Sequence, residues 1–110
     1  MSTIQPLDDS GHPIPVLRLK SGGARIASAA AISTRIGPFA GDIRVIALFA
    51  TGPVFIRTGD ATVVATGTDH FFPEGTYCDV SLGDQRQGRH SHLAVIRAEV
   101  DCTLYISEKE

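Results

Sequence analysis

The sequence predicts an all-β protein: a small antiparallel β-sandwich, jelly-roll-like, that carries an extended N-terminal arm. Short runs rich in Val, Ile, Thr and Phe alternate in the way that half-buried strands do. Clusters of Gly, Pro and Asp interrupt these runs about every eight to twelve residues, a spacing typical of β-sandwiches and small barrels. The 110 residues suit one domain, and a hydrophobic fraction of 43% without tryptophan predicts an aliphatic core.

Residues 1–23 are rich in proline and glycine and are predicted to form the arm, which leaves residues 24–110 as the single β-sandwich domain. Pro13 and Pro15 hold the backbone extended and remove two hydrogen-bond donors, so this stretch does not suit a central strand. Residues 16–19 (VLRL) are the part able to pair at a sheet edge. Because exposed sheet edges attract such segments, we expect the arm to dock on a neighbouring subunit.

Residues 24–36 (ARIASAAAISTRI) fit two structures. Five alanines favour a helix through their intrinsic propensity. As a strand, the same residues place Ile26, Ile32 and Ile36 on one side and the two arginines on the other. The β-branched residues at the ends and the Gly37-Pro38 stop favour the strand.

From residue 42 onward the predicted strands are clearer. Residues 43–49 (IRVIALF) are apolar on both sides apart from one arginine, which suits a strand buried between two layers. Further strands are expected at residues 54–57, 62–65, 70–72 and 77–82, followed by a polar loop at 83–89. The last two segments, 92–98 and 102–107, lie so close in sequence that they are predicted to form an antiparallel hairpin. The predicted core includes Val45, Ala47, Phe49, Val80, Leu93, Val95, Leu104 and Ile106.

Charge is distributed unevenly along the chain. The net charge of −2 gives no long-range attraction to nucleic acid or to an anionic membrane. Residues 1–57 carry six basic and three acidic residues, whereas residues 58–110 carry four basic and nine acidic ones. Such asymmetry either places a basic segment on an acidic surface, in the same chain or in a neighbour, or reflects scattered solvated charges.

The two cysteines, Cys78 and Cys102, each fall within a predicted strand. We expect both to be reduced and buried, because free cysteine behaves as a small apolar residue and disulfides are rare inside cells. The first eleven residues have neither a basic cap nor an apolar core, so a secretory signal is not expected. An intracellular protein is therefore predicted.

Three histidines suggest one alternative function. His90 and His92 form an HxH pair, and on a strand both imidazoles would lie on one face. With His70 as a third ligand, they would outline the site of a cupin-like small β-barrel that binds a metal or small molecule. The further histidines and the glutamate of cupin motifs are missing. We expect instead that His90 ends the polar loop and His92 begins a strand, and no metal or cofactor is predicted.

Catalysis has no support in the sequence. Acidic residues are dispersed, so no pair suggests a general acid and base. The nucleophile motif GxSxG and the phosphate-binding loops GxxxxGK[ST] and GxGxxG do not occur. Arg86 and Arg89 lie in a polar loop without neighbouring aromatic residues, which gives little support for single-strand nucleic-acid binding. The protein is therefore predicted not to be an enzyme, and no catalytic residue is assigned.

The order of segments from residue 43 onward resembles a type of small phage and prophage virion protein. The resemblance lies in IRVIALF, in VFIRTG, in the variable stretch DATVVATGT, in the corner DHFFPEG, and in the strands YCDVSL, LAVIRA and CTLYISE. The opening IQPLDDSGHPIPV is also similar to the arm of such proteins. This chain departs from the short form of the type in its longer loop, GDQRQGRH, at residues 83–90.

The resemblance implies a non-enzymatic structural or assembly protein of a phage or prophage particle, such as a capsid-decoration, head-spike or neck component. It implies a homo-oligomer, a trimer as the first expectation, that contacts other virion proteins and neither nucleic acid nor membrane. Its location would be the virion, after synthesis in the bacterial cytoplasm. The resemblance assigns no functional residue.

Overall fold

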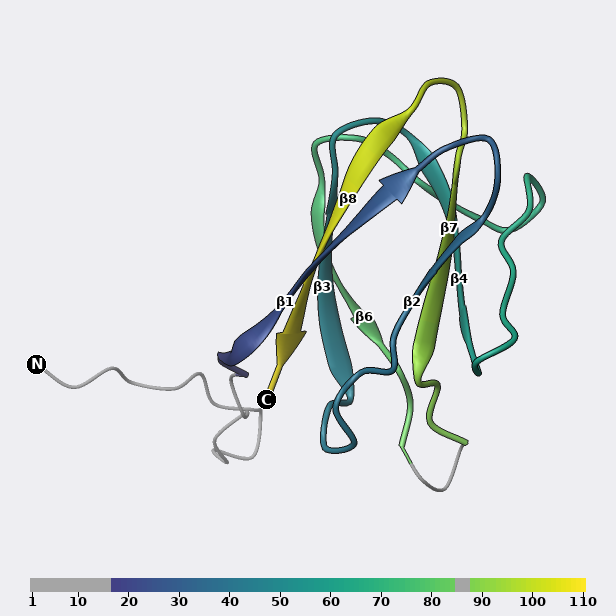
Figure 1. Ribbon diagram of the computed structural model, residues 1–110. Coiled ribbons are helices and arrows are strands. Elements are labelled where there is room, and N and C mark those ends of the chain that lie inside the picture. Colours follow the sequence, from purple (N-terminus) through teal and green to yellow (C-terminus); the bar gives the residue numbers. More distant parts are fainter. Residues whose placement is uncertain (1–16, 85–87) are drawn as a thin grey trace, which may run out of the picture.

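The computed structural model describes residues 17–84 and 88–110, and these residues form eight strands and no helix. Two four-stranded antiparallel sheets pack face to face, as Figure 1 shows. The strands are β1 (Leu19–Ala29), β2 (Thr34–Ile36), β3 (Val45–Ala50), β4 (Val54–Gly59), β5 (His70–Phe72), β6 (Tyr77–Ser81), β7 (His92–Arg97) and β8 (Cys102–Lys109). Most of the predicted arm, residues 1–16, and residues 85–87 of the predicted polar loop lie outside the described residues.

The strand order identifies the architecture. The first sheet has the order β1-β8-β3-β6 and the second has the order β2-β7-β4-β5. Only β4 and β5 are neighbours both in sequence and within one sheet, so every other connection crosses from one sheet to the other. Eight strands wound in this way form a jelly roll, which confirms the predicted all-β sandwich.

The predicted terminal hairpin is wrong. β7 pairs with β2 and β4 in the second sheet, whereas β8 pairs with β1 and β3 in the first. The short connection crosses the end of the sandwich, where the amide of Ala98 donates to the carbonyl of Pro53. The sequence could not distinguish the two arrangements. Apolar and polar residues alternate along a strand in the same way whether the next strand pairs with it or faces it across the core.

The core lies between the inner faces of the two sheets. Its members include Ile43, Ile46, Leu48, Val54, Leu82, Leu93, Val95, Leu104 and Ile106. The predictions for Leu93, Val95, Leu104 and Ile106 are therefore confirmed, and Val80 packs against this core.

In β3 the predicted inward face is the wrong one. Ile46, Leu48 and Ala50 are fully buried, whereas Val45 and Phe49 are only partly buried. Ala47 is buried but does not belong to the core cluster. Because β3 is apolar on both faces, its alternation does not indicate which face lies inward.

The ambiguous segment 24–36 forms strands, but in two different sheets. β1 turns Ala27 and Ala29 inward and leaves Ile26 exposed, so the small residues face the core. β1 begins at Leu19, and the expected arm boundary at residue 23 thus falls within a strand. The pairing register shifts between Leu19 and Ala24, and Gly22 within that interval has a φ of +76° that suits glycine.

Part of the uneven charge is paired within the chain. Arg25 Nε lies 3.2 Å from Glu108 Oε1, and Arg18 and Lys20 lie within 3.5 Å of Glu110. The basic start of the chain therefore lies along the acidic end of β8. Of these groups only Glu108 is fully buried.

Two further predictions need correction. Both cysteines are free, but Cys78 is exposed because β6 is an edge strand, while Cys102 is half-buried. Burial raises the pKa of the Cys102 thiol. The predicted strand at residues 62–65 is not a strand, and these residues belong to the long connection between β4 and β5.

Candidate functional site

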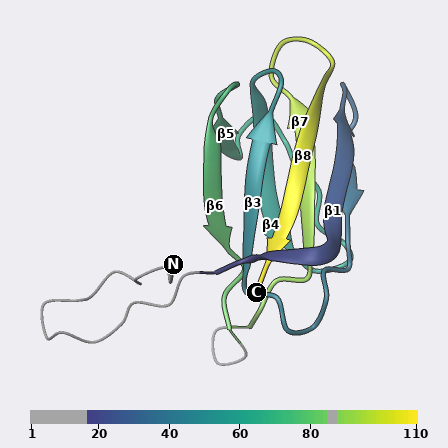
Figure 2. The same cartoon turned by 90° about the vertical axis from the view of Figure 1, so that its left-hand side faces the viewer.

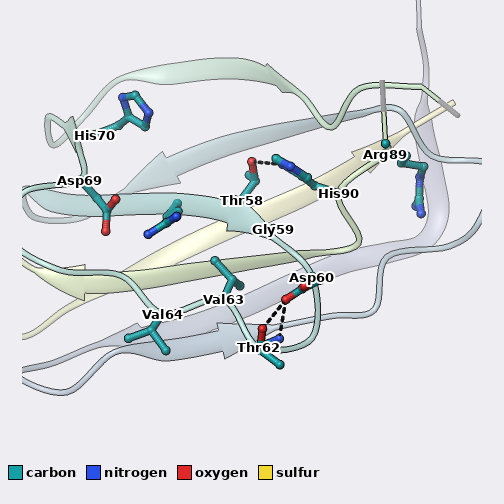
Figure 3. Close-up of a pocket in the computed structure, with 12 residues that line it drawn as sticks. Thr58, Gly59, Asp60, Thr62, Val63, Val64, Asp69, His70, Arg89 and His90 are labelled. Carbon is teal, nitrogen blue, oxygen red and sulfur yellow. Dashed lines mark hydrogen bonds between the residues drawn. The ribbon is translucent and has the colours of Figure 1, made fainter. Parts of the chain in front are cut away.

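A pocket opens where β5 leaves the edge of β4. β5 pairs only with Val54–Ile56, so the rest of β4 has no β5 partner. The cavity there measures about 1050 Å³ and is open to solvent. Figure 3 shows the side chains that line it. Its lining residues are Arg57, Thr58, Gly59, Asp60, Thr62, Val63, Val64, Asp69, His70, Gly88, Arg89 and His90.

The structure does not bring the three predicted histidine ligands together. His70 lies beside Asp69 at one end of the pocket, and His90 lies toward the other end (Figure 3). His92 is the first residue of β7 and does not line the pocket; its Nδ1 is 2.7 Å from Ser91 Oγ. Among residues 17–84 and 88–110, no three His, Cys, Asp or Glu side chains are grouped to hold a metal ion. The expectation that His92 begins a strand and His90 precedes it is confirmed.

One hydroxyl–imidazole pair lies in this pocket. Thr58 Oγ1 is 2.7 Å from His90 Nδ1, a separation that can activate a hydroxyl nucleophile when a third group orients the imidazole. In the described part of the chain, no carboxylate contacts His90. Among the residues that the structure describes, the pair therefore has no orienting group of the kind found in a catalytic triad.

The acidic groups of the pocket stabilise local turns. Asp60 Oδ1 accepts hydrogen bonds from the amide and the hydroxyl of Thr62, at 2.8 and 2.6 Å, and the pKa of Asp60 is lowered by these bonds. Asp69 Oδ2 accepts a hydrogen bond from the amide of Thr66 at 2.7 Å. Both carboxylates thus hold the β4–β5 connection in shape.

Arg89 has a structural role that the sequence did not indicate. Its guanidinium donates to the carbonyls of Phe39, Ala40 and Ile43, the last at 2.6 Å. It thus joins the polar loop to the turn before β3. The sequence offered no signal for this contact, because the donor and acceptors lie more than 40 residues apart.

A second candidate site is the outer face of the first sheet. The register aligns Ile26, Tyr105, Phe49 and Tyr77 in one row across all four strands. We call these four residues the apolar row. Three of them are strongly exposed: Ile26 at 66%, Tyr77 at 58% and Tyr105 at 46%. Figure 2 shows this face toward the viewer, and above the start of β1 no described segment crosses in front of it.

The outer face of the second sheet is covered in part by the chain itself. Val63 and Ala65, in the connection between β4 and β5, pack on Ala94 with Ile96 beside them. The amide of Ala65 donates to Ser33 Oγ at 2.9 Å, which fastens this connection to the sheet. We call residues 62–65 the covering segment. It buries Ala94 completely although Ala94 points away from the core.

Comparisons with protein families, with curated proteins and with solved structures give no match for this chain. No helix in the described ranges is long and apolar enough to cross a membrane.

Proposed function

We propose that this protein is a non-enzymatic structural or assembly subunit of a phage or prophage particle, where it acts as a homo-oligomer in contact with other virion proteins. The observation that carries the proposal is the bare outer face of the first sheet with its apolar row. The segment order described above supports the placement in a particle. The jelly roll is compatible with it, since viral capsid proteins use this architecture, as do lectins and cupins.

The composition of the bare face supports association. Monomeric soluble proteins seldom expose large contiguous apolar patches, and such patches indicate interaction sites. Tyr and Phe are also enriched at protein–protein interfaces relative to other surfaces. The apolar row places two tyrosines and one phenylalanine side by side on adjacent strands. A protein–protein contact would remove these side chains from water.

The pocket supports a structural role better than a catalytic one. Its carboxylates stabilise turns, Arg89 is engaged by backbone carbonyls, and the Thr58–His90 pair has no orienting carboxylate in the described chain. The side chains of Arg57 and His70 have no hydrogen-bond or ion-pair partner among the described residues. Two exposed side chains of this kind do not form a catalytic constellation.

The arm is part of the proposal. The backbone of Arg18 exchanges two hydrogen bonds with Glu110, so the chain is attached to the end of β8 from this point onward. Residues 1–16 precede this attachment and include the apolar residues Ile4, Leu7 and Ile14. Contact with another protein surface would remove these side chains from water. We place that surface on a neighbouring subunit or another virion protein.

The test is whether the protein is a component of particles. Particles from the natural host would be purified on a density gradient and analysed by mass spectrometry. We expect the chain at a fixed ratio to the major capsid protein. Its absence from intact particles would contradict the proposal. A stoichiometric metal in the purified chain would favour the cupin-like alternative instead.

A further inference from the structure

We propose that β6, the outermost strand of the first sheet, pairs edge to edge with β6 of a second copy of this chain, antiparallel about a two-fold axis at Cys78. The two first sheets would then form one eight-stranded sheet. This contact goes beyond the proposed function. It uses the edge of the sheet rather than the bare outer face, and it does not depend on the presence of a particle.

β6 has a free backbone edge. It is the last strand in the order β1-β8-β3-β6, and β3 is its one partner in the sheet. The amide of Leu82 donates to the carbonyl of Arg44 opposite it, so the alternate residues of β6 turn their backbone groups outward. These outward-facing residues are Tyr77, Asp79 and Ser81. Within residues 17–84 and 88–110, their amides and carbonyls bond to no other backbone group.

The edge is also accessible and regular. Four of the five residues of β6 are exposed, and its pairing with β3 has no register shift. Figure 2 shows β6 at the margin of the molecule, with β5 behind it. The other described edges suit pairing less, because β2 and β5 have three residues each and the register of β1 shifts between Leu19 and Ala24.

The charge on this edge is neutralised. A charged side chain on an edge strand usually prevents pairing with a second chain. The side chain of Lys109 crosses Ala47 to reach Asp79, where Lys109 Nζ lies 2.9 Å from Asp79 Oδ1. This hydrogen bond raises the pKa of Lys109, which keeps the lysine charged beside its partner. The edge therefore presents an ion pair without net charge, which does not repel an identical edge.

The same ion pair selects the position of the axis. With the axis at Cys78, Tyr77 lies opposite the partner's Asp79, and the two residues exchange backbone hydrogen bonds in both directions; the symmetry then repeats this pair. Tyr77 already borders the ion pair in its own chain, since Lys109 Nζ is 5.5 Å from the centre of its ring. An axis at Asp79 would instead place two carboxylates directly opposite one another, which destabilises a strand pair.

The exposed thiol of Cys78 would lie on the axis. The backbone of Cys78 faces β3, so the two copies of this residue would form a pair without mutual backbone hydrogen bonds. The Cα atoms of such a pair are about 4.5 Å apart, within the range that a disulfide spans. The contact itself needs no disulfide, but Cys78 reports on it.

The length of the edge sets the expected strength. Five-residue strands supply few hydrogen bonds and little apolar area, less than the roughly 800 Å² on each partner that a stable interface buries. We therefore expect a reversible dimer that dissociates on dilution.

The first experiment is oxidation of the full chain with diamide at increasing protein concentration. Diamide accepts the two electrons and two protons that a pair of thiols releases on forming a disulfide. We expect a disulfide between the Cys78 residues of two chains, located by peptide mass mapping. It should form at least tenfold faster than the disulfide of the reference Ile32→Cys/Cys78→Ser. Ile32 is 81% exposed but lies in the β1–β2 connection, so the reference measures random collision. Equal rates would overturn the inference.

The second experiment tests the axis and the edge. Val80→Cys, with Cys78 retained, should still form the disulfide between the two Cys78 residues, whereas one between Cys78 and position 80 would contradict the axis. Asp79→Pro removes an amide that faces the partner but not β3, and should lower the rate to that of the reference. Ser81→Pro is the matched control, because its amide faces outward beyond the paired residues, and it should keep the rate. Thermal melting checks that each variant is folded, and the Val80→Cys result decides if Asp79→Pro is not.

The edge contact can be separated from the bare face and from the proposed function. Tyr105→Lys changes the bare face two strands away from β6 and should leave the Cys78 disulfide unchanged; loss of the disulfide in this variant would assign the contact to the face. A chain found in particles that forms no Cys78 disulfide would leave the proposed function standing and overturn the edge contact. A fast Cys78 disulfide in a chain absent from particles would support the edge contact alone.

Discussion

The chain covers part of the outer face of the second sheet but leaves the outer face of the first sheet exposed. The second sheet has its apolar outer residue Ala94 buried beneath Val63 and Ala65 of the covering segment. The first sheet exposes Ile26, Tyr77 and Tyr105, and no described segment lies over them. A jelly roll needs apolar residues only on its inner faces. On the second sheet the chain itself covers Ala94, although Phe71 on the same outer face stays 58% exposed, whereas on the first sheet no described segment covers the exposed apolar residues.

Few contacts hold the covering segment on the outer face of the second sheet. The covering segment is not a strand, and it is held by a few hydrogen bonds from neighbouring elements. The amide of Ala65 donates to Ser33 Oγ, and Arg35 Nη1 donates to the carbonyl of Val63 at 3.4 Å. A few apolar side chains and two hydrogen bonds thus suffice to bury Ala94. The apolar row, by contrast, leaves Ile26, Tyr77 and Tyr105 exposed, and a partner would bury them.

The largest expected loss of stability results from placing a charge beneath the covering segment. Ala94→Asp would bury an unpaired carboxylate at a site that is fully buried, and should cost about 3 kcal/mol of the free energy of unfolding. Tyr105→Asp on the bare face should change the stability of the monomer by less than about 0.5 kcal/mol. Urea denaturation of both variants measures the difference. Equal losses would show that the two faces are not distinct.

The next largest loss of stability is expected in β1, an edge strand of the first sheet. Arg25→Leu removes the ion-pair partner of Glu108, which is 2% exposed, and leaves a buried carboxylate without compensation. We expect a loss of about 2 kcal/mol, below the usual cost for a fully buried pair because Arg25 is one-third exposed. Amide exchange should show β1 opening first. The Arg25 guanidinium also lies 5.5 Å from the centre of the Phe39 ring. The double variant Arg25→Leu/Glu108→Gln should recover most of the stability, and failure to recover would point to the loss of this contact with Phe39 instead.

A smaller effect is expected where the covering segment is fastened. Ser33→Ala removes the acceptor for the Ala65 amide and should cost about 1 kcal/mol. The exchange of the amides at residues 63–65 should accelerate while the core strands keep their protection. Ser28→Ala is the matched control, because Ser28 is exposed on the opposite sheet. Unchanged protection at residues 63–65 would mean that Val63 and Ala65 are held by packing alone.

The smallest effect depends on pH. The hydroxyl and amide of Thr62 hold the pKa of Asp60 below its ordinary value of 3.8. The turn is therefore stabilised above that value, and the stabilisation is lost as the pH falls through the lowered pKa. NMR shifts of Thr62 should change in this acidic range. Asp60→Asn should abolish the change, and a persistent titration would assign it to another group.

The sequence predicted what depends on alternation along single strands. The strand segments, most of the inner face, and the start of β7 at His92 follow from period-two patterns and turn residues. It did not predict which strands pair, because a hairpin and a crossing between sheets need the same alternation. The pairing of β8 with β3 rather than β7 depends on how the connections cross the ends of the sandwich.

The candidate sites were less predictable, for a related reason. The sequence predicts Phe49 to lie in the core, but Phe49 belongs to the outer apolar row. The row is visible only when four strands from distant parts of the chain are placed in register. The apolar pattern of the covering segment predicts a strand, because a segment that packs on a sheet and one that pairs within it can both be apolar.

Hydroxyl-radical footprinting of the full chain at increasing concentration tests most directly whether the chain associates through the bare face. Tyr105 and Tyr77 report on the apolar row, and Phe71, which is 58% exposed beside Phe55 on the second sheet, reports on the other outer face. We expect the two tyrosines to lose reactivity as the concentration rises while Phe71 keeps its own. Protection of Phe71 with unchanged tyrosines would contradict the assignment of the bare face as the association surface.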